Sequence, residues 1–410
     1  QWSQYGAQIY GDTVETPTIT VTGDMTFPST PGATGRVVFG YNGSYLDVKL
    51  NGDFTIDDDN AVMTAPVEFT NTGSTQKAEH KAGYIGYGSW TVNKTSPALP
   101  DPAAVFELPY GLTLSNNANL TFISTGSRPG EIDLDDDLTI SGSLTLTFDP
   151  SGPGTFDWQT HNVQVYGNFT YDTTFEMQQT TGDFRVGGTY TQSNPNGFTA
   201  GAGTAMNFGN VNISAGDFDI SAAASVSITG YYTQTAGTAT MPDETLDVGS
   251  HFSVTGPGVI FNAVPGQVIT IGGHFTLDGC TFTGLTSQAM SVGGSFILLN
   301  GTVFTSTTGT LTLGYAANLA EEIDFSGGEF VDNGGTVEIR VNNISNYMYL
   351  TTDGDDFNNL VFNRTYNVHA YTYIYLKDDV ETVNLTVKDE SVQWSQYGAQ
   401  IYGDTVETPT

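Results

Sequence analysis

The chain has 410 residues and a formal net charge of -33 at pH 7, because it contains 44 acidic residues but only 11 lysines and arginines. This shortage of cations argues against binding to nucleic acids and to anionic membrane surfaces, both of which need clustered Lys and Arg. A single cysteine, Cys280, excludes an internal disulfide framework and a zinc site built from cysteines. No apolar run approaches the ~18 residues of a membrane span, so we expect no membrane contact in this segment.

The sequence QWSQYGAQIYGDTVETPT at 1–18 returns unchanged at 393–410. An identical segment of this length indicates a tandem repeat. We therefore expect one full repeat plus the start of the next, as part of a longer and extended protein. Artificial duplication of one end is the alternative.

Strand patterns begin with the alternating TITVT at 18–22. We divide the repeat into an opening strand region at 1–27, an irregular β region at 28–109, a regular β-solenoid at 110–334, a final β-solenoid or β-sheet region at 335–392, and the start of the next repeat at 393–410. The irregular region is either a series of distorted coils with long loops or an inserted small β domain, because Pro97, Pro100 and Pro102 mark a break within it.

The regular region repeats one phrase: two apolar residues two positions apart, a corner that contains glycine, and then an aromatic or β-branched residue. That last position is occupied by Phe169, Tyr190, Val211, Tyr232, Phe252, Phe275 and Phe296. The period is too short for a propeller blade and contains no helical segment. It predicts an all-β fold, a parallel β-solenoid with ~21-residue coils stacked about 4.8 Å apart, in which these seven residues form a ladder in the core.

Two further interior columns are predicted before the glycine corner. The first contains Val163, Phe184, Ala205, Val226, Leu246, Ile269 and Met290, and the second contains Val165, Val186, Asn207, Ile228, Val248, Ile271 and Val292. Asn207 breaks the apolar pattern. We expect a bulge there that displaces Phe208 by one position.

The phrases GGTYT, GGHFT, GGSF and GGEF, together with FNNLVFN, resemble repeats of large secreted β-solenoid surface proteins of prokaryotes, the adhesin-like and filamentous haemagglutinin-like proteins. The resemblance covers about 110–392. It implies a secreted protein at the cell surface and brings no catalytic residues with it.

Two acidic clusters are candidate calcium sites, because Ca²⁺ prefers several oxygen ligands supplied by loops. They contain Asp133, Asp135 and Asp137, and Asp353, Asp355 and Asp356. Neither cluster has the spacing of an EF-hand. Solvated turn residues are the alternative, and the sequence requires no cofactor.

Two other groups of side chains suggest binding. His251 and His274 precede ladder aromatics in successive coils, so we expect their rings about one strand spacing apart, either as a metal-binding or pH-sensitive pair or as part of an outward polar row. Tyr371, Tyr373 and Tyr375 share one face of a strand. That face would bind sugar rings, pack against another rod, or be covered by its own chain.

A polysaccharide-cleaving β-helix would need paired carboxylates, about 6.5–9.5 Å apart for inversion. Adjacent acids occur at Asp136–Asp137 and Asp355–Asp356, but we expect no His or Arg companion beside them. No GxSxG, HExxH or P-loop motif is present. We therefore predict that the chain is not an enzyme.

These observations favour a structural repeat of an extracellular filament or surface fibre, which scaffolds or adheres and is joined end to end to identical repeats. Lateral contacts between rods and contacts with glycans are further expected interactions. A carbohydrate-binding or polysaccharide-cleaving β-helix is the alternative. A third possibility is a non-covalent filament whose separate subunits join through the duplicated strand.

Overall fold

The computed structural model describes the residues 8–9, 17–27, 37–39, 46–57, 61–70, 75–80, 85–86, 88–96, 105–108, 112–115, 117–126, 131–148, 154–171, 175–179, 181–243, 245–263, 266–284, 289–316, 322–341, 347–364, 372–389 and 399–403. Every regular element in these residues is a β-strand. The described part of the chain has no helix with the length and hydropathy of a membrane span. The predicted all-β fold is confirmed: the strands pair in parallel and form a β-solenoid whose turns are spaced about 23 residues apart.

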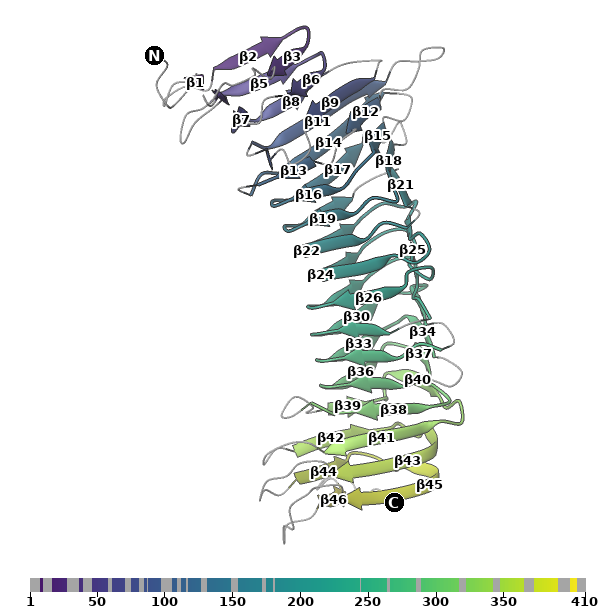
Figure 1. The fold of residues 1–410 in the computed structure, drawn as a ribbon. Helices are drawn as coiled ribbons and strands as arrows, with labels where there is room; N and C mark the ends of the chain where they lie inside the picture. Colours follow the sequence, from purple (N-terminus) through teal and green to yellow (C-terminus); the bar gives the residue numbers. More distant parts are fainter. Residues whose placement is uncertain are drawn as a thin grey trace. The chain divides into compact units, whose positions relative to one another are not determined.

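The chain divides into two compact units, Gln1–Phe208 and Gly209–Thr410. Within each unit, a turn of chain contributes up to three short strands, and within each sheet a strand pairs in parallel with the equivalent strand of the next turn. The strands therefore form three columns in each unit, numbered here by their order within a turn. Figure 1 shows strands of the second unit, such as β30, β33 and β36, stacked like rungs.

The strands of the first unit fall into these columns as follows. The first column contains β1 (Gln8–Ile9), β4 (Val37–Phe39), β7 (Ala61–Met63), β10 (Ile85–Gly86), β13 (Leu112–Leu114), β16 (Leu138–Ile140), β19 (Val163–Val165) and the beginning of β22 (Phe184–Gln192). The second contains β2 (Thr18–Val21), β5 (Asp47–Leu50), β8 (Val67–Phe69), β11 (Trp90–Ser96), β14 (Leu120–Gly126), β17 (Leu144–Phe148), β20 (Phe169–Tyr171) and the end of β22. The third contains β3 (Met25–Phe27), β6 (Phe54–Ile56), β9 (Gln76–His80), β12 (Val105–Leu108), β15 (Glu131–Leu134), β18 (Gly154–Gln159) and β21 (Phe175–Gln179), and β23 (Phe198–Thr199) follows β22.

β24 (Ala205–Ile213) spans the division between the units. In the second unit the first column contains β26 (Ser225–Ile228), β29 (Leu246–Val248), β32 (Ile269–Ile271), β35 (Met290–Val292), β38 (Thr310–Leu313), β41 (Thr336–Val341), β43 (Asp356–Arg364) and β45 (Glu381–Asp389). The second contains β27 (Tyr232–Gln234), β30 (Phe252–Thr255), β33 (Phe275–Asp278), β36 (Phe296–Leu299), β39 (Glu322–Asp324), β42 (Tyr347–Thr351), β44 (Thr372–Leu376) and β46 (Ala399–Gly403). The third contains β25 (Phe218–Asp219), β28 (Thr238–Thr240), β31 (Ile260–Asn262), β34 (Thr281–Thr283), β37 (Thr302–Thr305) and β40 (Gly328–Val331).

The aromatic period of the sequence places like residues on top of one another. In the first unit Phe169 pairs with Tyr190, and their rings are stacked with centroids 5.5 Å apart. In the second unit the register runs through five of the ladder residues, namely Val211, Tyr232, Phe252, Phe275 and Phe296. A second aromatic column on the third strands packs edge-on against this ladder, as Phe282 does against Phe275 at 5.6 Å.

The irregular region at 28–109 contains strands that pair with the columns around them. β5 pairs with β2 and with β8, and β8 pairs with β11, all in parallel. In the third column β6 pairs with β3 and β9. The boundaries drawn from the sequence between this region and its neighbours stay predictions.

The coil that contains Asn207 differs from the predicted columns. Met206 and Phe208 are buried, whereas Ala205 and Asn207 are only partly covered. The inward residues of this coil are therefore Met206 and Phe208, one position later than the predicted Ala205 and Asn207. The physical reason is the alternation of a strand: only one of the two alternating sets faces the core, and here the apolar set is the later one.

At the corners between first and second strands, side chains of one turn accept hydrogen bonds from backbone N–H groups of the next. The N–H of Thr189 donates to Asn168 Oδ1 at 2.9 Å, and the N–H of Tyr231 donates to Asn210 Oδ1 at 3.1 Å. These bonds satisfy donors at the bend of the chain, where an unpaired buried N–H would be costly. A Cβ on Gly188 would collide with Asn168 Oδ1, which explains the glycine at this corner.

Replacing Phe275 with alanine is expected to lower the free energy of unfolding by about 3 to 5 kcal/mol, because it opens a cavity in the core. The backbone pairing holds the turns above and below in place, so they cannot move in to fill the cavity. Phe275 is fully buried and stacks on Phe252 and Phe296 at 5.2 and 4.9 Å. Its neighbour Thr276 faces outward, so the matched variant Thr276→Ala should cost under about 1 kcal/mol. Urea denaturation followed by circular dichroism measures both. Equal costs for the two variants would contradict the assignment of the core.

Candidate functional site

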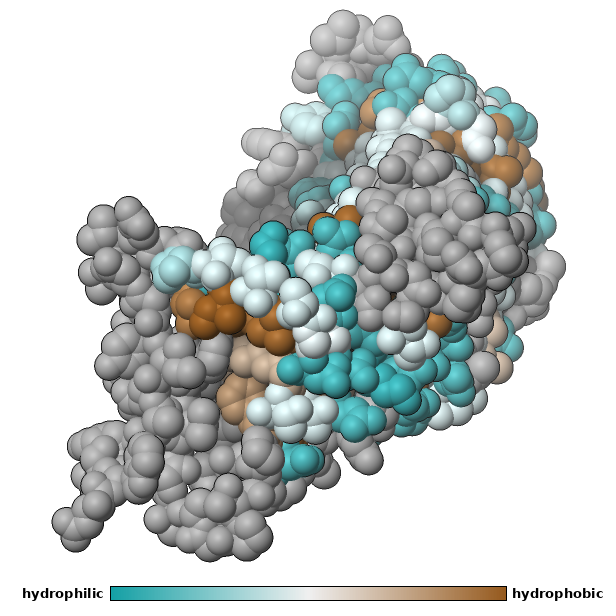
Figure 2. All heavy atoms as spheres, turned by 90° about the horizontal axis from the view of Figure 1, so that it is seen from above, coloured by the Kyte–Doolittle hydropathy of each residue, from teal (hydrophilic) through white to brown (hydrophobic). Residues whose placement is uncertain are grey.

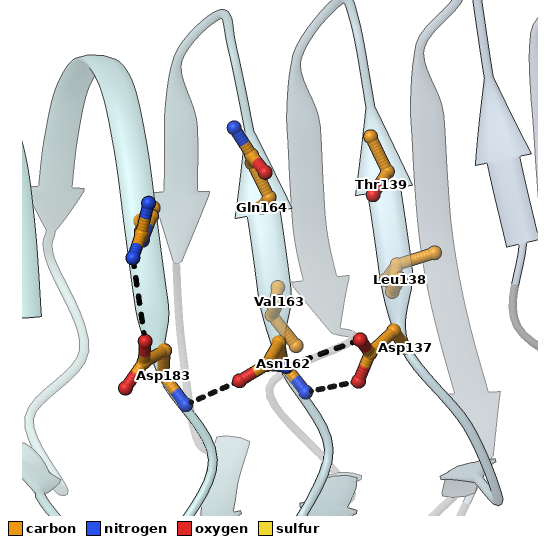
Figure 3. Close-up of a pocket in the computed structure, with 8 residues that line it drawn as sticks. Asp137, Leu138, Thr139, Asn162, Val163, Gln164 and Asp183 are labelled. Carbon is orange, nitrogen blue, oxygen red and sulfur yellow. Dashed lines mark hydrogen bonds and ion pairs between the residues drawn. The ribbon is translucent and has the colours of Figure 1, made fainter. Parts of the chain in front are cut away.

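A row of polar side chains lies in the first unit where the first-column strands begin. Asp137, Asn162 and Asp183 each immediately precede such a strand: β16, β19 and β22. Because Leu138 pairs with Val163 and Val163 with Phe184, the three polar residues lie in successive turns side by side, as Figure 3 shows.

We call such a row, in which a side chain of one turn accepts a hydrogen bond from a backbone N–H of the next turn, a corner ladder. The bonds to Asn168 and Asn210 belong to a first corner ladder, and this row is a second one. The N–H of Asn162 donates to Asp137 Oδ1 at 2.7 Å, and its Nδ2 donates to Asp137 Oδ2 at 3.0 Å. The N–H of Asp183 in turn donates to Asn162 Oδ1 at 2.9 Å. The dashed lines in Figure 3 follow these bonds from turn to turn. Each side chain thus lies just before the first-column strand of its own turn and accepts a hydrogen bond from a backbone N–H of the next turn.

A hollow of about 150 Å³ lies over this row. Its lining residues are Asp137, Leu138, Thr139, Asn162, Val163, Gln164, Asp183 and Arg185. Arg185 and Asp183 form an exposed ion pair at 3.4 Å. Pockets for small ligands usually enclose about 300 to 1,000 Å³, so this hollow has room for a few water molecules but not for a buried sugar ring.

One group of converging metal-ligand atoms occurs in the part of the chain that the structure describes. Ligand atoms of Asp136, Asp137 and His161 lie within 4.8 Å of one another. Asp137 already accepts two hydrogen bonds from Asn162, so a cation would compete with the corner ladder. The expectation that no histidine accompanies Asp136–Asp137 is wrong. Coil length brings His161 beside them, although it follows them by a full turn in sequence.

Asp133 and Asp135, the other two members of the first predicted calcium cluster, do not belong to this group of ligand atoms. Asp133 pairs with Glu107 on one side and Asp157 on the other, in an outward column of carboxylates. Burial raises the pKa of Asp133 above its ordinary value, and the charges of Asp135 and Asp157 raise it further. Asp135 itself is exposed. Calcium binding by Asp133, Asp135 and Asp137 stays a prediction.

The second predicted cluster surrounds a tight turn before β43. Asp353 is exposed and has a φ of 54°, and Asp356 is exposed as well. Asp355 is partly buried, and burial is the main cause that raises its pKa to about 6. The nearby carboxylate of Asp378 accepts hydrogen bonds from the N–H groups of Thr352 and Asp353. Calcium binding by Asp353, Asp355 and Asp356 likewise stays a prediction.

The two histidines of the predicted pair make different contacts. His251 stacks on Tyr231 with centroids 5.1 Å apart. His274 belongs to a corner ladder, in which the N–H of Ser295 donates to its Nδ1 at 3.1 Å. His274 thus occupies the structural position that Asn168 and Asn210 hold in other turns.

An aromatic surface lies on the outward side of the second column near the end of the second unit. Tyr371 lies outside the described residues, whereas Tyr373 and Tyr375 are partly exposed on β44. Tyr375 pairs with Tyr349, with ring centroids 5.7 Å apart, and Lys377 Nζ lies 4.5 Å from the centre of the Tyr349 ring. We call Tyr349, Tyr373, Tyr375 and Lys377 the tyrosine surface.

A charged network in the same unit was not predicted from the sequence. Glu338 Oε1 accepts hydrogen bonds from Asn363 Nδ2 at 2.6 Å and from Arg340 Nε at 3.1 Å, and Lys388 Nζ lies 3.8 Å away. Burial tends to raise the pKa of Glu338, but these hydrogen bonds and positive charges outweigh it and leave the pKa below its ordinary value. The network joins β41, β43 and β45. No motif marks it, because its members come from three successive turns.

The variant Asn162→Asp is expected to lower the free energy of unfolding by about 1 to 2 kcal/mol, because it removes the amide donor to Asp137 and places a third carboxylate between two others. Added salt should reduce the loss. Asn168→Asp is the matched control, since Asn168 receives the N–H of Thr189 in the same way and bonds to the neutral Ser143 on its other side. Urea denaturation at two salt concentrations measures both variants. A loss of the same size in both would contradict the electrostatic account.

Asp355 should make the fold less stable as the pH rises. Its pKa is about 6 in the fold, above the ordinary value of 3.8, so the folded chain holds the proton more tightly than the unfolded chain does. The stabilisation is complete below pH 4 and is lost as the pH rises through 6. Asp355→Asn should therefore be more stable than the unaltered chain at pH 7, by about 1 kcal/mol after allowance for solvent screening, and equally stable near pH 4. Denaturation midpoints between pH 4 and 7 test this, and a constant difference across that range would refute it.

Comparison with models of protein families, with curated proteins and with solved structures finds no match for this chain. The β-solenoid fold rests on the parallel register of its own strands. The resemblance to secreted surface proteins rests on the glycine-corner phrases and stays an expectation.

Proposed function

We propose that the chain is a structural repeat unit of an extracellular filament or surface fibre, which scaffolds or adheres and has no catalytic role. The observation that carries this proposal is the combination of an exact sequence repeat at 1–18 and 393–410 with strands that pair turn upon turn in each unit. A fold whose turns contact only their neighbours lengthens by addition of further turns and needs no closed globular core.

The proposed mechanism is mechanical. Parallel backbone hydrogen bonds join each turn to the next, and stacked aromatic pairs such as Phe252–Phe275 fill the centre. The corner ladders add side-chain bonds at the bends, where the strand pairing is interrupted. A net charge of -33 would keep such filaments apart and soluble, and the 11 lysines and arginines offer few sites for trypsin-like proteases outside the cell.

Electron microscopy of the native material tests this function. We expect thin continuous rods with an axial repeat of roughly 80 to 90 Å, because a repeat of 392 residues at about 23 residues per turn makes about seventeen turns of about 4.8 Å each. Mass measurement under denaturing conditions then separates one long covalent chain from a polymer of separate subunits. Isolated globular particles in native material would contradict the proposal.

Carbohydrate binding is a second candidate function, favoured by the tyrosine surface. Tyr349 and Tyr375 present two neighbouring rings on the outward side of one column, beside the cation of Lys377. Aromatic rings next to a hydrogen-bond donor suit the apolar face and hydroxyl groups of a sugar. Binding of soluble polysaccharides by the purified chain, lost in Tyr375→Ala but kept in Tyr166→Ala, would support this candidate. Tyr166 is the matched control because it is an exposed tyrosine elsewhere in the chain.

A further inference from the structure

The last first-column strand of the second unit exposes residues that continue the core. Leu311, Val337, Leu360 and Leu385 pair in sequence along this column. The first three are at most 2% exposed, whereas Leu385 is 57% exposed. Val387 shows the same change after Phe362, from 4% to 57%. These side chains hold core positions in a turn that no further described strand covers.

The network around Glu338 fixes the position of this exposed strand. Arg340 pairs with Asn363 and Asn363 with Lys388, so the charged groups that meet at Glu338 span β41, β43 and β45. Lys388 is the member of the network on β45, and a shift of β45 by one residue would turn Lys388 away from Glu338 and lose this ion pair. The ion pair therefore favours the register in which Leu385 and Val387 continue the core columns.

The first turn of the first unit is only partly covered. Met25 and Phe27 on β3 are partly exposed, although their partners Phe54 and Ile56 in the next turn are at most 1% exposed. Among the described residues, β3 pairs with β6 alone and β45 pairs with β43 alone. Figure 2 looks down on the end where the N-terminus lies in Figure 1 and shows hydrophobic atoms at the surface among hydrophilic ones.

The duplicated segment pairs differently in its two copies. Near the N-terminus Gln8 and Ile9 form β1 and pair with Val38 and Phe39 of β4, in the following turn. In the second copy Gln400 and Ile401 are the same residues of the segment, and they pair with Tyr373 and Ile374 of β44, in the preceding turn. A strand has two edges that form hydrogen bonds. The two copies together therefore show one segment with a partner on the preceding side and a partner on the following side.

We propose that this segment is a strand shared between copies of the chain: β46 of one copy takes the place of β1 against β4 of a second copy. This inference rests on the proposed filament and names its joint. Each unit winds from the first column to the second and then to the third. At the end of the second unit the beginnings of β43 and β45 continue the third column, because the Phe357 ring lies 5.2 Å from Phe330 of β40 and Phe357 pairs with Thr382. In the first unit β1 lies in the first column, whereas β46 lies in the second column, so the strands that follow β46 are displaced by one column. β2 of the added copy then lies in the third column, and β3 lies in the first column, next to β45.

This arrangement covers the exposed core residues at both ends. Met25 and Phe27 of the added copy lie over Leu385 and Val387, so apolar side chains meet apolar side chains in the spacing of the columns. The free edges of β3 and β45 pair with each other, which protects both from uncontrolled association. A second copy of this sequence is the partner that fits, because only it supplies both the following strand β4 for the segment and the apolar β3 for β45.

A disulfide test probes the joint directly. Thr26 and Thr386 are exposed on β3 and β45. They would lie on neighbouring strands, within the 4.4–6.8 Å between Cα atoms that a disulfide bridges. The variant with Thr26→Cys and Thr386→Cys, in a Cys280→Ser background, should give a ladder of oligomers on a non-reducing gel. The matched control has Thr121→Cys in place of Thr26→Cys and should stay monomeric. No ladder, or the same ladder from the control, would overturn the proposal.

A second test needs no cross-link. Leu385→Asp with Val387→Asp should weaken self-association of the 410-residue chain at least about tenfold in sedimentation, because two charges would enter an apolar joint. Tyr166→Asp, at an exposed tyrosine on another surface, should leave association unchanged. A synthetic peptide QWSQYGAQIYGDTVETPT should shorten the oligomers by competing for the edge of β4. If the double variant fails to fold by circular dichroism, the peptide and the disulfide ladder decide the outcome.

These results separate the joint from the function. Rods in native material without a disulfide ladder would refute the shared strand and leave the filament proposal standing. A monomeric chain together with globular native material would refute both.

Discussion

Every turn of this chain has to place its apolar residues over those of the turn before it, because a single turn of three short strands buries almost nothing by itself. The ladder from Val211 to Phe296 meets this constraint with one aliphatic and four aromatic residues at one register. The same constraint acts on the backbone. At each bend the chain leaves N–H groups without a strand partner, and side chains such as Asn168 and Asn162 of the preceding turn accept their hydrogen bonds. Core columns and corner ladders are two consequences of one stacking rule.

The fold could be predicted from the sequence because stacking repeats the same demand in every turn. The aromatic period and the glycine corners predicted a parallel β-solenoid. The corner glycines have a physical cause, because a Cβ would collide with oxygen atoms of the preceding turn, with a side-chain oxygen at Gly188 and with backbone carbonyls at Gly272 and Gly273. In the coil at Ala205 the predicted core residues are one position too early in the sequence. The spacing of the repeats does not say which of the two alternating sets of side chains on a strand faces the core. Burial of Met206 and Phe208 settles that choice.

The candidate site was harder to predict, because corners are separated by unequal lengths of chain. Asp137 bonds to Asn162, which is 25 residues later, whereas Asn162 bonds to Asp183 after 21 residues. No fixed period connects these positions. The proximity of His161 to Asp136 could not be predicted either, because it too depends on the length of that turn. The network at Glu338 also joins three turns of different length. Clusters of acids that are close in sequence, by contrast, alternate along a strand or spread around a turn, so Asp133 and Asp137 do not converge.

The central claim is that turns stack in parallel along the axis in which the material grows. X-ray fibre diffraction from aligned native filaments measures this directly. The account predicts a strong meridional reflection near 4.8 Å, because the strands lie across the filament axis and repeat along it. A reflection at that spacing on the equator, or its absence from well-aligned filaments, would contradict the account.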